Sequence, residues 1–415
     1  MTIITGLSGN EIYCLKKKNL LPGNLVIGNS VYSLGLLRSI GSGLKILAGG
    51  EITAVTNLIH TGRLLAYKRM LAEAKSHGGI GITGVSNDLI FQGTNIEFLS
   101  IGSTVHHDID QDLDKNGDVD DRFKFSTSAD GQALYSQLDS GFKPKQFVFG
   151  NVAYSIGVGG GLVGGLRSLA RGEIKQYSQI FNKTRHLALE RIAAEASAVG
   201  ANAVVGIKTS ILPLAGMQEM VMIGTASRHA MLPESNYKNP ITSDLTNEEM
   251  WNLVNQGYMP VKLVLGASVY SLGFIGGLSS FLRSFVKGEI TTMTTLIYEA
   301  RENALKHIEL DAQQCGADQV VGIKTYVYDL GGGIIEFLAI GTAVKRMEGL
   351  TTESEQLIPQ AIIRDQDTFI NSADGTRDVS LNRNVNSTSI MSIVLGLLIF
   401  FFVVVMQLVN IFSHH

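Results

Sequence analysis

One glycine motif in this sequence, Gly159-x-Gly161-x-x-Gly164, has the spacing of the fingerprint that binds the pyrophosphate of dinucleotides. It follows a strand-like segment and precedes a helix-like one, as that fingerprint does. Such a site also needs an acidic residue about 20 positions later to bind the ribose. The next strand-like segment, NAVVGIKT at 202–209, has no acid at its end. We therefore predict that the chain does not bind a dinucleotide.

An acidic stretch at 108–123, DIDQDLDKNGDVDDRF, has much of the spacing of a calcium-binding loop. The candidate ligands, counted from the first loop position, are Asp112, Asp114, Asn116, Asp118 and Asp120. The twelfth position, where a bidentate Glu normally completes the loop, is Phe123. Two interpretations stay open: a calcium site, which makes calcium the one candidate cofactor, and a solvated acidic linker.

Cysteine and histidine, the usual ligands of soft metals, are not clustered in the sequence. The two cysteines, Cys14 and Cys315, lie far apart. The histidines do not recur at matching positions of the repeats described below, apart from His107 and His229. We therefore expect no shared transition-metal site.

Carboxylates, in contrast, recur at three aligned positions, and so does an arginine. The recurrent residues are Glu51, Glu173 and Glu289 at the expected start of a long helix, Glu73, Glu195 and Asp311 near its end, Glu97, Glu219 and Glu336 on a later strand, and Arg63, Arg185 and Arg301. The first set fits charges that favour a helix N-terminus, and the others fit ion pairs with the arginines. No nucleophile–base pair recurs, so we predict no catalytic residues and no enzymatic activity. A site between subunits is the alternative.

The elements that position these residues form a unit that occurs three times. QFVFGNVAYSIG (146–157) matches KLVLGASVYSLG (262–273) and NLVIGNSVYSLG (24–35). After each come a glycine-rich stretch, the tripeptide Gly-Glu-Ile, a helical pattern of about 25 residues and two strand-like runs, the second of which has an alternating pattern. Gly200 and Gly316 are the predicted C-terminal stops of the helix in the second and third copies. Ser8, Asp130 and Thr246 are aligned N-cap candidates for a short helix that precedes each copy. The pattern predicts a βαββ unit, and the dinucleotide-like glycine spacing occurs in only one of the three copies.

The glycine-rich stretch of each copy mixes large apolar residues with one or two cations. A small βαββ sheet leaves edges and apolar patches that a partner usually covers. We therefore interpret the stretch as an oligomer contact formed by Leu166, Arg167, Leu169, Phe281, Leu282 and Phe285. An ordinary core loop and insertion into a membrane surface are the alternatives.

The C-terminal part contains 23 residues without a formal charge, IMSIVLGLLIFFFVVVMQLVNIF at 390–412. That length crosses a bilayer core of about 30 Å. Three arginines precede it, which by the positive-inside bias keeps the bulk of the chain on the cytoplasmic side. We predict a single-pass C-terminal membrane anchor on a polar tether at 347–389, with a buried core helix as the alternative. The N-terminus has no pattern of a secretory signal peptide.

The combined motif of the repeat resembles the YbjQ-like family. The second copy carries the resemblance best, through Tyr154, Gly172, Glu173, Ala188, Glu195, Asn202, Gly206, Gly224 and Thr225. The third copy has Asp318 at the Asn202 position, and the first has Ile80. The resemblance implies dodecin-like βαββ subunits that assemble into symmetric rings, typically pentamers. The family is often labelled heavy-metal-binding, without an established activity.

The expected fold is α+β, with three tandem dodecin-like βαββ units, a short helix before each, and one C-terminal transmembrane helix. The expected limits are 8–107, 128–229 and 243–346 for the repeats and 108–127 and 230–242 for the linkers. We expect a membrane-anchored scaffold that self-assembles into ring- or cage-like homo-oligomers, with an unknown protein cargo or partner. A protein that binds a metal or small ligand between subunits is the alternative. The net charge of −3 gives no sign of nucleic-acid binding.

Overall fold

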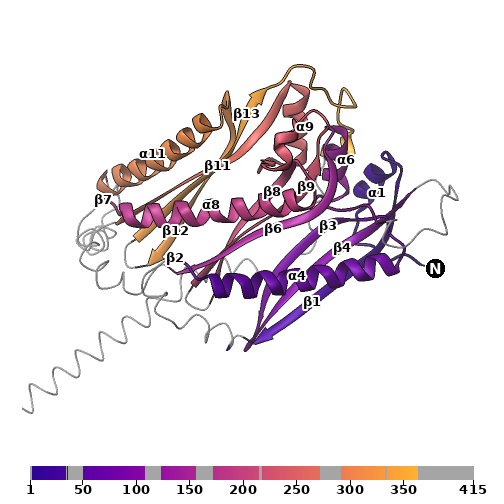
Figure 1. Cartoon of the computed structure of the whole chain (residues 1–415), viewed down its shortest axis with the longest axis horizontal. Coiled ribbons are helices and arrows are strands. Elements are labelled where there is room, and N and C mark those ends of the chain that lie inside the picture. The colour runs from indigo at the N-terminus through magenta and orange to yellow at the C-terminus, as the bar shows by residue number, and fades with distance from the viewer. Residues whose placement is uncertain are drawn as a thin grey trace, which may run out of the picture. The chain divides into compact units, whose positions relative to one another are not determined.

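The computed structural model describes residues 2–33, 35, 50–107, 123–155, 172–214, 217–271, 291–331 and 334–362. They belong to one compact unit, Met1–Asp365, in which the three repeats follow one another (Figure 1). No helix among these residues is long and apolar enough to cross a bilayer. Residues 390–412 lie outside the described part, so the membrane anchor stays a prediction.

Each repeat is a βαββ unit, as the sequence predicts, and the fold is α+β. Repeat 1 consists of β1 (Leu20–Ser33), α4 (Thr53–Ser76), β3 (Gly81–Gln92) and β4 (Asn95–His107). Repeat 2 consists of β6 (Lys143–Ser155), α8 (Lys175–Ala198), β8 (Ala203–Leu214) and β9 (Met217–Arg228). Repeat 3 consists of β11 (Tyr258–Ser271), α11 (Thr291–Gln314), β12 (Gln319–Gly331) and β13 (Ile334–Arg346).

The last strand of each repeat lies between the other two, in the orders β1-β4-β3, β6-β9-β8 and β11-β13-β12, and all these pairings are antiparallel. The long helix packs on strand one of its own sheet. The helices α4 and α8 also contact strand one of the following repeat, β6 and β11 respectively (Figure 1). These two helices therefore bury side chains on two sides.

Glycines end the long helices and bend the second strands. Gly200 and Gly316 have left-handed backbones (φ 67° and 64°), which confirms the helix stop that the sequence predicts at these positions. Gly206 and Gly322 (φ 63° and 65°) lie where the second strand shifts its register against the third. A residue with a Cβ adopts this conformation only under strain, so the motif Gly-Ile-Lys-Thr marks a bulge.

The short helices that precede the repeats are α1 (Gly9–Lys16), α6 (Gly131–Asp139) and α9 (Asn247–Asn255). Their N-caps are the predicted ones: Ser8 and Thr246 form capping boxes, and Asp130 accepts a hydrogen bond from the Ala133 amide. The helix α1 packs on α6, and α6 packs on α9. A four-residue helix, α12 (Pro359–Ile362), contacts α1 and α6.

The predicted start of the long helix at Glu51 and Glu173 is wrong by two residues. The helices begin at Thr53 and Lys175, and neither has an acidic residue in its first turn. Glu51 and Glu173 instead belong to two-residue strands, β2 (Gly50–Glu51) and β7 (Gly172–Glu173). The backbone there pairs with the next repeat, which keeps it extended. Glu289 lies outside the described residues.

Candidate functional site

The contact between consecutive repeats, called a joint here, exchanges strands in both directions. The strands β2 and β7 leave their own repeats and pair antiparallel with β6 and β11, strand one of the next repeat. In return, β5 (Phe125–Ser126) pairs in parallel with β3, and β10 (Ile241–Thr242) with β8. Both return strands lie in the segments 108–127 and 230–242, which the sequence suggested were linkers. Each joint therefore extends two sheets at once.

A helix side chain and the backbone of the helix N-cap residue also bind the backbone of strand one at each joint. In joint 1–2 the Ala153 amide donates to Thr56 Oγ1 at 2.9 Å, and the Ile52 amide donates to the Ala153 carbonyl at 2.9 Å. In joint 2–3 the Val269 amide donates to Ser178 Oγ at 2.9 Å, and the Ile174 amide donates to the Val269 carbonyl at 2.7 Å. The two joints use aligned residues, so one contact is built twice.

A buried ion pair lies at the centre of each joint. Arg63 of α4 donates through Nη2 to Glu219 Oε2 of β9 at 2.7 Å and through Nε to Oε1 at 3.1 Å. Arg185 of α8 donates through Nη2 to Glu336 Oε2 of β13 at 2.8 Å. All four side chains are almost fully buried. In each pair the arginine makes at least two hydrogen bonds to one carboxylate, which offsets the cost of burying the charges. Arg185 Nη1 is buried without a hydrogen-bond partner among the described residues.

The predicted arginine–carboxylate pairing is thus confirmed for two pairs. The sequence did not show which carboxylate pairs with which arginine. Each arginine pairs with the carboxylate of the following repeat. The carboxylates near the helix ends do not pair with these arginines: Glu73 accepts from the Ile27 amide at 2.7 Å, and Glu195 accepts from the Phe149 amide at 3.0 Å. Glu51, expected to act as a helix-end charge, accepts from Arg191 of the next repeat at 2.7 Å.

A histidine–aspartate contact also crosses joint 2–3. His186 Nε2 of α8 lies 3.1 Å from Asp311 Oδ2 of α11, and Lys262 donates to the other oxygen at 2.9 Å. The hydrogen bond to Asp311 raises the pKa of His186, although burial opposes it. Burial tends to raise the pKa of Asp311, but its bonds to His186 and Lys262 hold it below its usual range.

This contact predicts that joint 2–3 weakens above neutral pH. A histidine with a raised pKa contributes stability that is full below its unfolded-state value and is lost as the pH rises through the folded-state value. The thermal midpoint of the chain should therefore fall more between about pH 6 and about pH 8 than that of His186→Gln. Parallel profiles for the two proteins, measured by circular dichroism, would contradict this.

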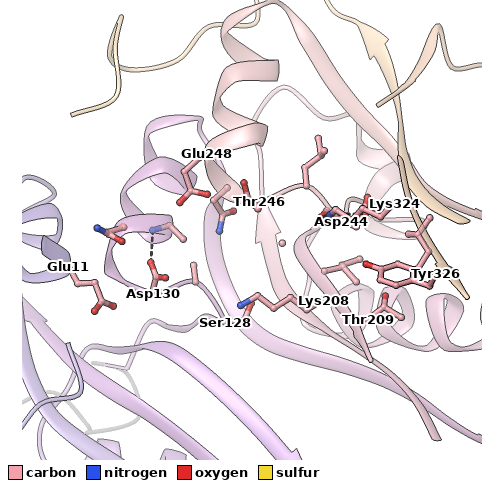
Figure 2. A pocket seen from close by; sticks show the side chains of 18 residues that line it. Glu11, Ser128, Asp130, Lys208, Thr209, Asp244, Thr246, Glu248, Lys324 and Tyr326 are labelled. Atoms are coloured by element: carbon pink, nitrogen blue, oxygen red, sulfur yellow. Dashed lines mark hydrogen bonds and ion pairs between the residues drawn. The ribbon is translucent and has the colours of Figure 1, made fainter. Parts of the chain in front are cut away.

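A cavity of about 600 Å³ opens where parts of all three repeats meet. Figure 2 shows Glu11 and Asp130 on one side, Lys324 and Tyr326 on the other, and Lys208 between them. The wall also contains the N-termini of α6 and α9 and the glycine bulge of β8. These parts are aligned elements of different repeats, so packing of the repeats creates the cavity.

The cavity is polar and carries both signs of charge. Lys324 donates to Asp244 Oδ2 at 3.3 Å, and Thr342 donates to Asp244 Oδ1 at 2.7 Å. Two of its lining oxygens, Asn247 Oδ1 and Thr209 Oγ1, are buried without a hydrogen-bond partner among the described residues. Unpaired buried polar atoms next to a cavity favour a bound polar molecule or water.

The calcium-loop candidates 112–120 and the oligomer-contact residues 166–169 and 281–285 lie outside the described residues, so both sites stay predictions. The glycine motif 159–164, for which we predict no dinucleotide binding, lies outside them too. Within the part of the chain that the structure describes, no three His, Cys, Asp or Glu side chains gather as metal ligands would. His229 packs against Phe142 with ring centroids 4.6 Å apart and the rings tilted by 48°, and burial lowers the pKa of His229.

The Asn position of the repeat motif has a structural role. Asn202 accepts from the His229 amide and donates to the His229 carbonyl, both at 2.9 Å. Asp318, its counterpart in repeat 3, accepts from the Arg346 amide at 2.8 Å. The side chain therefore ties the start of strand two to the end of strand three. In both repeats the contact uses a side-chain carboxylate or amide oxygen as the acceptor.

The fold and joints define a class of protein: tandem βαββ repeats that bind one another through exchanged strands and buried ion pairs. The chain belongs to the YbjQ family, described as "Putative heavy-metal-binding", whose profile matches residues 19–106, 142–230 and 255–347. This confirms the resemblance inferred from the repeat motif.

Several known proteins are similar to the chain. An encapsulin nanocompartment protein of Mycobacterium tuberculosis is 27% identical over 233 residues, which cover 54% of this chain and 85% of that protein. A UPF0145 protein of Methanoregula boonei is 38% identical over 96 residues, covering 23% of this chain and 78% of the relative. A UPF0145 protein of Thermoplasma volcanium is 45% identical over 80 residues, covering 19% and 66%. The latter two match lengths close to one repeat, and the first matches a length close to two repeats.

Proposed function

We propose that this protein is a membrane-anchored scaffold that self-assembles into a ring- or cage-like homo-oligomer and has no enzymatic activity. The observation that carries the proposal is the joint, which appears twice in the chain with aligned strands, hydrogen bonds and ion pairs. A contact that works between any two consecutive repeats is suited to repetition beyond one chain.

The similarity to an encapsulin nanocompartment protein supports assembly into a larger particle. The apolar segment 390–412 would attach the assembly to a membrane, with the bulk on the cytoplasmic side, and several anchors in one particle would act together. The glycine-rich stretches around Leu166 and Phe281 would add contacts between molecules.

Size measurement of the full-length protein tests the proposal. The chain, extracted in mild detergent, should elute as a particle several times its mass of 44.7 kDa by light scattering. Electron micrographs of the same sample should show closed particles of uniform size. A monodisperse monomer at high concentration would refute self-assembly. Recovery in the soluble fraction of lysed cells would refute the anchor alone.

The cavity between repeats favours a second candidate function, binding of a small polar ligand. Its two unpartnered oxygens and the Lys208 ammonium group offer both hydrogen-bond and charge complementarity, as far as the described residues show. Native mass spectrometry of the purified full-length protein should then show a retained small molecule. Lys208→Met should release it, whereas Lys68→Met, at an exposed position of α4, should retain it. An unliganded mass for the wild type, together with no metal by elemental analysis, would exclude this candidate.

A further inference from the structure

The joint has a direction, because its two sides come from different elements. The preceding repeat contributes the outer face of its long helix and the free edge of its second strand. The following repeat contributes strand one, the last-strand carboxylate and a short segment that precedes its first helix. A chain of three repeats therefore has two joints and two unused sides, one at each end.

On the unused side of repeat 1, side chains of strand one are exposed. The aligned side chains of repeats 2 and 3 are covered by the preceding repeat. Val31 of β1 is 54% exposed, whereas the aligned Ala153 and Val269 are 0% exposed beneath the preceding helix. Ile27, four residues before Val31 on the same face of the strand, is exposed as well. Glu97, aligned with Glu219 and Glu336, forms no ion pair among the described residues and accepts from the side-chain amides of Asn29 and Gln92.

The unused side of repeat 3 has the residues that the preceding repeat contributes to a joint. Tyr298 of α11 is 62% exposed, although the aligned His60 packs on the Phe149 ring across joint 1–2, with centroids 5.0 Å apart. Arg301, aligned with Arg63 and Arg185, is exposed and forms no ion pair within the described residues. Its guanidinium lies over the Phe337 ring at 5.5 Å, much as Arg63 lies over Phe98 at 6.0 Å.

The sheet edges at the two ends are complementary too. The sheet of repeat 2 has five strands, because β10 pairs with β8 and β2 pairs with β6. In the described part of repeat 3, the sheet ends at β12, where Ile323 is 46% exposed and the aligned Ile207 only 3%. Ile3 and Ile4 align with Phe125–Ser126 and Ile241–Thr242, the return strands of the two joints, and both side chains are exposed.

We infer that molecules of this protein associate head to tail, with repeat 3 of one chain docked on repeat 1 of the next as repeats dock within the chain. Arg301 then pairs with Glu97 of the next molecule, and Tyr298 covers its Ile27. The segment Ile3–Ile4 of that molecule adds a parallel strand to β12. This inference rests on the proposed self-assembly and specifies its interface. The contact is heterologous, so it closes into a ring when the rotation between molecules permits.

Charge reversal tests the ion pair in the full-length protein in detergent. Arg301→Glu and Glu97→Arg should each weaken association at least about a hundredfold, because each places two like charges in a buried contact. The double variant Glu97→Arg/Arg301→Glu should restore the particle, since the pair is then reversed. Mixing the two single variants should restore it in part. Circular dichroism and the thermal midpoint of each variant check that the repeats stay folded.

Cysteine cross-linking tests the geometry independently of charge. In a Cys14→Ala/Cys315→Ser background, Ile27→Cys/Tyr298→Cys should form disulfides between chains under mild oxidation and give a ladder of covalent oligomers. Tyr298→Cys alone should give none, because a tail-to-tail contact does not form. Leu310→Cys with Ile27→Cys is the matched control and should give no ladder. Leu310 is exposed on the same helix, and its counterpart in repeat 2, Ala194, stays exposed although α8 takes part in joint 2–3.

The outcomes separate this inference from the function on which it rests. A monomeric wild type overturns both. An assembled wild type that keeps its size in both single charge variants and gives no disulfide ladder overturns the head-to-tail contact alone. Disulfide dimers from Tyr298→Cys alone likewise overturn it, in favour of a symmetric contact. Loss of the particle in the single variants, rescue in the double variant and a ladder support it.

Discussion

Replacing Glu336 by glutamine should lower the free energy of unfolding of the full-length chain by about 3–5 kcal/mol. The substitution keeps the shape of the side chain but leaves the Arg185 guanidinium buried without its counter-charge. Arg185 would retain the Tyr154 and Phe181 rings, 4.9 Å and 5.2 Å from its guanidinium carbon, which replace only part of the loss. Urea unfolding in mild detergent, followed by circular dichroism, measures the effect. Urea is uncharged, so it does not screen the ion pair.

The double variant Arg185→Met/Glu336→Leu is the matched control. Removal of both charges should restore most of the lost stability, because two apolar side chains of similar volume need no compensation in a buried joint. A Glu336→Gln protein within about 1 kcal/mol of the wild type would show that the pair does not stabilise joint 2–3.

Replacing Gly150 by alanine should also destabilise the chain strongly, by about 3 kcal/mol or more. Gly150 lies on strand one directly beneath α8, and an added Cβ would come closer than 3.0 Å to the Ala188 carbonyl and the Ile192 amide. These are backbone atoms of a helix held on two sides, so they cannot move independently. The aligned Gly28 and Gly266 meet α4 and α11 in the same way. The thermal midpoint and the urea midpoint report the loss.

Gly9→Ala serves as the control for this substitution. Gly9 is the first residue of α1, and nothing among the described residues lies within 4 Å of its added Cβ. Alanine favours the helix more than glycine does, so stability should be unchanged or slightly higher. If Gly150→Ala unfolded at the same urea concentration as Gly9→Ala, close helix–strand packing would not explain the recurrent glycine.

Local patterns in the sequence predict the individual repeat well. Several predicted features depend on residues close in sequence. They are the capping boxes at Ser8 and Thr246, the helix stops at Gly200 and Gly316, and the alternating final strands. Such interactions depend on backbone conformation and neighbouring side chains, so they can be inferred without the tertiary structure. Recurrence of the unit three times strengthens each inference.

The joints were less predictable, because their partners lie far apart in the chain. The arginine–carboxylate pairing could be proposed from recurrence, but the partner of Arg63 is Glu219, 156 positions away, and not Glu97 of its own repeat. Glu51 was assigned to a helix start because a carboxylate before an apolar helix usually has that role. The strand that it forms with β6 exists only once repeat 2 is placed beside repeat 1.

The sequence by itself determined the βαββ unit, its three copies, the short helices and the family, because these follow from residue spacing and from self-similarity. Only the tertiary structure decided which repeat completes which sheet, which carboxylate neutralises which arginine, and where a polar cavity opens. These depend on how one folded surface fits another, and aligned residues in equivalent repeats look alike until packing gives each joint its direction. The same packing leaves Glu97 at one end of the chain and Arg301 at the other.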